Sequence, residues 1–113
     1  MSTVQQSSVD MKALEELREI MGEDFNQLIS VFISDSLKRL SDLDTAIKNN
    51  DAAEVRAVAH SFKGSALNLS AVALTELCKE LETTGREQQL AGAAALLVKI
   101  EDEFAQVRRC FSA

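Results

Sequence analysis

His60 is the only histidine of the chain and the residue best suited to nucleophilic chemistry. A nitrogen of a neutral imidazole can attack an electrophile near neutral pH. On a helical projection that advances by about 100° per residue, His60 lies outside the apolar stripe of its segment and should face solvent. An exposed histidine on a helix usually has no special role, so its neighbours must carry the argument.

Two cations, a glycine and a leucine share the expected outer face with His60. Lys63 lies one turn ahead and Arg56 one turn behind, so both could offset the charge of a phosphoryl group on the imidazole. Gly64 costs a helix about 1 kcal/mol relative to alanine, which close approach of a partner or helix–helix packing would explain. Leu67 is an apolar side chain on a polar face, where it could contact that partner. By spacing alone, ordinary solvated charges remain an alternative to a phosphoryl-transfer site.

Apolar residues recur at steps of three and four along most of the chain, a spacing typical of amphipathic helices. The pattern predicts a short helix capped by Asp10 and stopped by Gly22, followed by helices over about 23–48, 52–69, 71–84 and 87–111. Asp51 should cap the third of these five helices, and residues 83–85 should end the fourth.

The chain shows no strand pattern, linker or internal repeat. We therefore predict an all-α fold, an antiparallel up-and-down four-helix bundle with a short additional N-terminal helix. A coiled-coil dimer is the competing arrangement. The short turns argue against it, because a helical hairpin can bury its apolar stripe within one chain.

Length and composition limit the class of protein. The 113 residues suit one domain, expected over residues 10–113 behind a disordered lead at 1–9. A net charge of −6 disfavours binding to nucleic acid or an anionic membrane. No apolar run could span a membrane and no secretory signal is present, so we expect a cytoplasmic protein. We also expect it to be a monomer. The initiating Met1 and polar lead favour a free-standing protein over a domain of a larger one.

The cysteine and histidine residues of the sequence do not favour metal or redox chemistry. Cys78 and Cys110 are too far apart for a metal knuckle or a redox pair, and Cys78 should be a buried structural thiol. A di-iron bundle needs paired Glu-x-x-His elements, whereas the residue three before the lone His60 is Ala57. No glycine-rich phosphate loop is present, so we expect no ATP binding and no autokinase activity.

The segment over residues 59–66, Ala-His-Ser-Phe-Lys-Gly-Ser-Ala, resembles the signature of histidine-containing phosphotransfer (HPt) domains. The downstream elements Asn68-Leu69 and Leu77-Cys78-x-x-Leu81-Glu82 continue the family pattern, and the clear match covers about 55–82. The family fold is a four-helix bundle with an extra N-terminal helix, which agrees with the periodicity.

The resemblance implies roles for single residues. His60 would be phosphorylated on Nε2, with Lys63 as its charge partner. Gly64 would admit a receiver domain onto a docking surface that includes Ser61 and Leu67. Glu82 corresponds to the family residue that hydrogen-bonds the imidazole, fixing its tautomer. An exposed helix charge is the alternative for Glu82.

Ser70 departs from the family pattern, in which many members have glycine at this turn. Serine tolerates a left-handed backbone less well than glycine and is a good helix cap. We therefore expect Ser70 to cap the fourth helix.

The function implied by the resemblance is a phosphorelay. His60 would accept a phosphoryl group from the phospho-aspartate of a receiver domain and pass it to the aspartate of another. The partners would be response-regulator receivers, a hybrid sensor kinase, or both. The chain would need no cofactor, because Mg²⁺ would reside on the receiver. A helical adaptor that binds receivers without transfer is the alternative.

Overall fold

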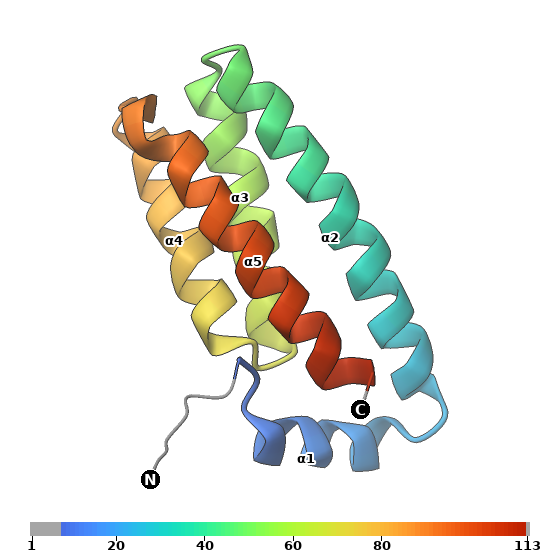
Figure 1. Cartoon of the computed structure of the whole chain (residues 1–113). Coiled ribbons are helices and arrows are strands. Elements are labelled where there is room, and N and C mark those ends of the chain that lie inside the picture. Colours follow the sequence, from blue (N-terminus) through green and yellow to red (C-terminus); the bar gives the residue numbers. More distant parts are fainter. Residues whose placement is uncertain (1–7, 113) are drawn as a thin grey trace, which may run out of the picture.

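The computed structural model describes residues 8–112, which form helices without any strand in this range. The elements are α1 (Met11–Met21), α2 (Asp24–Lys48), α3 (Ala52–Asn68), α4 (Val72–Arg86), the 3₁₀ turn η1 (Leu90–Gly92) and α5 (Ala93–Ser112). Figure 1 shows α2 to α5 as an antiparallel up-and-down bundle, with α1 lying across one end. The predicted fold class is confirmed.

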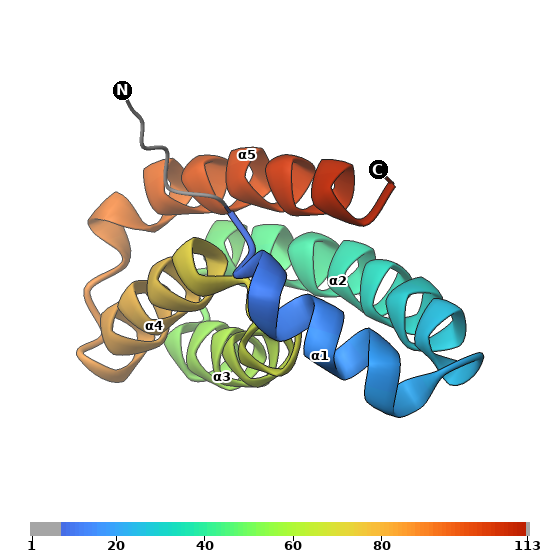
Figure 2. The ribbon, with the colours of Figure 1, turned by 90° about the horizontal axis from the view of Figure 1, so that it is seen from below.

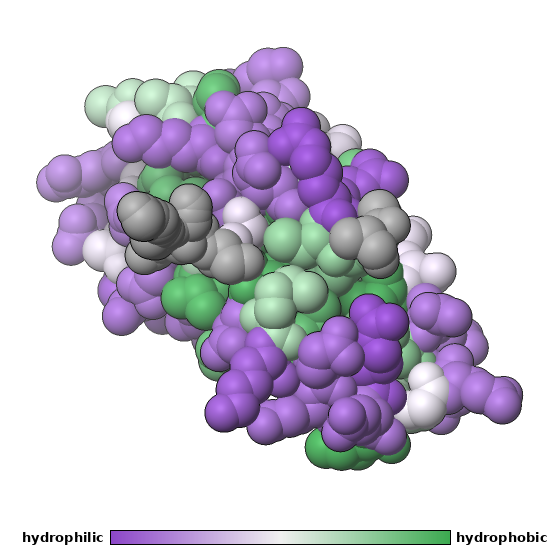
Figure 3. All heavy atoms as spheres, turned by 60° about the horizontal axis from the view of Figure 1, so that its bottom comes forward, coloured by the Kyte–Doolittle hydropathy of each residue, from purple (hydrophilic) through white to green (hydrophobic). Residues whose placement is uncertain are grey.

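Helices α3 and α4 form the most extensive helix–helix contact in the bundle. Helix α2 packs against α3 and α5, and α5 packs against α4. Seen from below, α1 lies in front of the bundle next to α2, α3 and α4, and it does not cross α5 (Figure 2). Apolar surface lies in the middle of this end of the molecule, framed by polar residues (Figure 3).

The core is aliphatic with a cluster of aromatic rings. Phe104 on α5 contacts Phe32 on α2 and Phe62 on α3, with ring centroids 6.1 and 6.5 Å apart. This cluster ties three helices together, so the apolar stripes are buried within one chain. Cys78 is fully buried, as expected, and burial raises the pKa of its thiol to about 12.

Two predicted helix caps are present. The side chain of Asp10 accepts a hydrogen bond from the backbone N–H of Ala13 at 3.2 Å, and Asp51 accepts one from Glu54 at 3.1 Å. Gly22 ends α1 with a φ of 59°, a positive value that glycine adopts without strain.

Ser70 does not cap the fourth helix, so that expectation is wrong. It takes the left-handed conformation, with a φ of 60°, and Ala71 stands at the cap position of α4 without a side-chain bond. The reason is the end of α3: Ser70 donates to Leu67 O and Ala71 donates to Ala66 O, both at 3.0 Å. These two hydrogen bonds can form together only if Ser70, the first residue beyond the helix end, adopts a left-handed conformation.

Two helix boundaries differ from the sequence prediction. Helix α4 continues through residues 83–85 to Arg86, because Gln88, with a φ of 56°, supplies the left-handed end that glycine was expected to supply. The last helix begins at Ala93 rather than near 87, after η1.

The N-terminal boundary also differs. Residues 1–7 of the expected disordered lead lie outside the described residues. Val9 is fully buried, however, and the backbone N–H of Asp10 donates to Ser70 O at 2.9 Å. The ordered domain therefore begins before Asp10.

Candidate functional site

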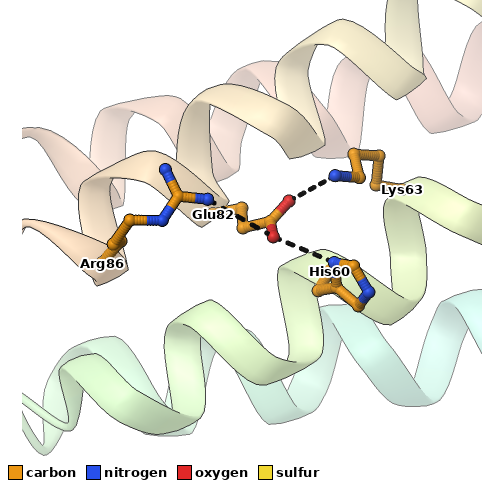
Figure 4. A network of polar contacts seen from close by, with 4 residues as sticks. All are labelled: His60, Lys63, Glu82 and Arg86. Carbon is orange, nitrogen blue, oxygen red and sulfur yellow. Dashed lines mark hydrogen bonds and ion pairs between the residues drawn. The ribbon is translucent and has the colours of Figure 1, made fainter.

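His60 lies on the outer face of α3, where its side chain is 67% exposed. Its Nδ1 is 2.9 Å from Oε2 of Glu82 on the neighbouring helix α4. The other ring nitrogen, Nε2, points away from Glu82 (Figure 4). One side of the imidazole is therefore anchored, and the other is left for a reagent.

Glu82 is the centre of a small network of charges. Its side chain is only 8% exposed, and Nζ of Lys63 lies 2.7 Å from its Oε1. The ammonium group of Lys63 at this distance holds the pKa of Glu82 below its usual value, against the opposing effect of burial and with further help from His60. Glu82 is therefore a carboxylate near neutral pH, and because a carboxylate only accepts, Nδ1–H must be the donor. This tautomer leaves the lone pair on Nε2.

The position of Glu82 depends on the close approach of α3 and α4. A Cβ atom built on Gly85 would lie 2.7 Å from the backbone nitrogen of Arg56 and 2.9 Å from the carbonyl oxygen of Ala52. Gly85 is one turn from Glu82 on α4, and Arg56 is one turn from His60 on α3. Only glycine lets the helices approach so closely, and this spacing brings the carboxylate to the ring.

The other predicted site residues lie along the exposed side of α3. Ser61 and Gly64 are exposed, and Leu67 is 66% exposed. A Cβ built on Gly64 would meet no atom within 4 Å, so packing within this chain does not explain the glycine. Arg56 is exposed as well and lines a shallow groove together with His60 and Glu82.

Sequence reasoning missed two features of the site. It placed Lys63 beside His60 but did not foresee that Lys63 would be bound to Glu82. It also overlooked Arg86, whose guanidinium lies 3.6 Å from Oε2 of Glu82. The spacing of four residues between Glu82 and Arg86 was an available signal, since such residues are neighbours on a helix.

Among the described residues, no cluster of His, Cys, Asp and Glu side chains could hold a metal ion.

The class of protein to which this bundle and its anchored histidine belong is shown by a match to a known family. The family model of the Hpt domain matches residues 27–110. The chain therefore belongs to the Hpt family, whose members are phosphotransfer proteins rather than kinases and interact with receiver domains in phosphorelays.

A solved structure extends the match to nearly the whole chain. The crystal structure of histidine-containing phosphotransfer protein B (HptB) from Pseudomonas aeruginosa PAO1 is 40% identical in sequence and gives a TM-score of 0.91. The match covers 96% of this chain and 94% of that one. No curated protein sequence shows a significant match. In the part of the chain that the structure describes, no helix is long and apolar enough to cross a membrane.

Proposed function

We propose that His60 accepts a phosphoryl group on Nε2 from the phospho-aspartate of one receiver domain and passes it to the aspartate of another. The observation that carries the proposal is the setting of the chain's single histidine. Its Nδ1 is held by a buried carboxylate at 2.9 Å, while its other nitrogen points outward. A family that transfers phosphoryl groups through histidine has no second candidate in this sequence.

The chemistry follows from the tautomer. The Nε2 lone pair attacks phosphorus in line with the aspartyl oxygen, so that a P–N bond forms while the P–O bond breaks. The released electron pair stays on the receiver's carboxylate. The proton remains on Nδ1, and the ring becomes an imidazolium ion whose charge Glu82 stabilises. Transfer to the second receiver reverses these steps and restores the neutral ring.

Cations of this chain and of the receiver share the charge of the phosphoryl group. Lys63, one turn from His60, would exchange its contact with Glu82 for the phosphoryl oxygens, and Arg56 would approach from the preceding turn. The receiver would supply the Mg²⁺ ion. In this mechanism the chain itself needs no cofactor.

The receiver would dock over the exposed side of α3. Gly64 leaves room there for a close approach, while Ser61 and Leu67 offer polar and apolar contacts. The donor and acceptor could be response regulators or the receiver of a hybrid sensor kinase. We expect the chain to act in the cytoplasm. We also expect it to act as a monomer, because one face of one chain holds every residue of the site.

A two-step transfer assay tests the proposal. A receiver labelled on its aspartate is mixed with the chain, and the labelled chain is then purified and offered to a second receiver. The relay predicts label on the wild-type chain and on the second receiver, with none on His60→Gln. Glu101→Gln, an exposed change on α5, serves as the control and should behave as wild type. A complex that forms without movement of label would establish the adaptor instead.

A further inference from the structure

The carboxylate of Glu82 has a second cation beside it, on its own helix. Arg86 lies 3.6 Å from Oε2, and its side chain is about half exposed, at 49%. Figure 4 shows the carboxylate between Lys63 on one side and Arg86 on the other, with His60 below it. Among the described residues, His60 and Lys63 from α3 and Arg86 from α4 are the ion-pair partners of Glu82 within 4.0 Å.

The environment of Glu82 changes when a phosphoryl group is transferred to His60. If Lys63 turns to the phosphoryl oxygens, the carboxylate loses the cation at 2.7 Å while its side chain stays only 8% exposed. A nearly buried carboxylate that loses its closest cation is destabilised and tends to take up a proton or swing towards water. Either change would take the negative charge of the Glu82 carboxylate away from the neighbourhood of Nδ1, at the moment the ring becomes cationic.

We propose that Arg86 is a positioning residue that keeps Glu82 ionised and directed at Nδ1 while Lys63 is engaged with the phosphoryl group. A guanidinium suits this task because it stays charged at any working pH. With Lys63 in contact with Glu82, Lys63 and His60 are the groups that lower the pKa of the carboxyl group, and Arg86 at 3.6 Å is not among them. Its contribution should therefore emerge when Lys63 leaves.

This inference rests on the proposed function of His60 and Lys63. A double-mutant cycle tests it, because Lys63→Ala imitates the departure of Lys63 from Glu82. The set comprises wild type, Lys63→Ala, Arg86→Gln and the double variant, with Arg86→Lys as the conservative replacement. Lys79→Gln removes an exposed cation elsewhere on α4 and is the matched control.

Two readouts are needed. The first is the rate of transfer from a labelled receiver. The second is the imidazole ¹⁵N spectrum of the unphosphorylated protein, which reports the fraction of the Nδ1–H tautomer. Because His60 is the only histidine, this spectrum needs no assignment.

We expect Arg86→Gln to slow transfer by about two-fold in the wild-type background and by about ten-fold in the Lys63→Ala background, since residues that share a partner couple. The double variant should also lose much of its Nδ1–H tautomer, and Arg86→Lys should restore most of both properties. Equal effects of Arg86→Gln in both backgrounds, or no effect in either, would overturn the proposal. If wild type accepts no phosphate, the proposed function fails, whereas the tautomer measurement still decides the role of Arg86.

Discussion

Nδ1 of His60 and Oε2 of Glu82 lie 2.9 Å apart across the α3–α4 interface, although 22 positions separate them in the chain. The contact joins an exposed ring to a nearly buried carboxylate. In the proposed mechanism it fixes the tautomer and supplies a negative charge where the imidazole becomes cationic. These two contributions can be separated by substitution.

Glu82→Gln should retain the tautomer but not the charge, because an amide oxygen can still accept from Nδ1–H. We expect transfer from a receiver to slow by a few-fold in Glu82→Gln and by about 10- to 100-fold in Glu82→Ala, the range typical of a lost orienting partner. Rapid-quench kinetics with labelled receiver would measure both. An alanine variant as fast as wild type would show that the contact has no role in transfer.

The lowered pKa of Glu82 makes a prediction about stability and pH. Its carboxylate stabilises the folded state fully above the ordinary glutamate pKa of 4.5, and this contribution is lost as the pH falls through the lower folded-state value. The advantage of wild type over Glu82→Gln in free energy of unfolding should therefore be constant above this range and shrink below it. Urea unfolding between pH 7 and pH 3 would measure the difference. An advantage that grows towards acid pH would contradict the ionised state of Glu82.

Gly85 and Gly64 allow a matched comparison of two glycines inside helices. Gly85→Ala should destabilise the fold by about 1–3 kcal/mol, because its new methyl group would press against the backbone of α3. Gly64→Ala meets open space and should stabilise α3 by about 0.5–1 kcal/mol. Thermal or denaturant unfolding of both variants gives the answer. Two variants of equal stability would mean that the helices are not held at this spacing.

Gly64 should matter for docking rather than folding. Gly64→Gln places a long side chain on the open face beside His60, so we expect unchanged or higher stability together with a loss of transfer of ten-fold or more. The transfer rate measured over a range of receiver concentrations would show the defect as weaker binding. Normal binding and transfer by this variant would place the receiver elsewhere on the protein.

Much of the fold could be predicted because it depends on local patterns. The apolar periodicity located the helices, and Asp10 and Asp51 marked two helix starts by a side-chain bond to a nearby N–H. The ends of α3 and α4 could not be located in this way. Ser70 and Gln88 adopt left-handed conformations without being glycine, and only the tertiary course of the chain requires this.

The site shows the same division. The exposure of His60 followed from the helical projection, and the contact with Glu82 followed from the family resemblance. The pairing of Lys63 with Glu82 depends on the distance between two helices. Gly85 sets that distance, although the sequence pattern indicated only a helix end there.

The chemical nature of the phosphorylated residue decides whether His60 is the phosphoryl acceptor. The purified chain, labelled by a phosphorylated receiver, is treated with acid and with alkali, and the label is then located by mass spectrometry. Phosphoryl transfer through the imidazole predicts a single phosphoryl group on His60, lost in acid and stable in alkali, and no label on His60→Gln. Label on a serine or an aspartate, or label retained by the His60→Gln variant, would contradict it.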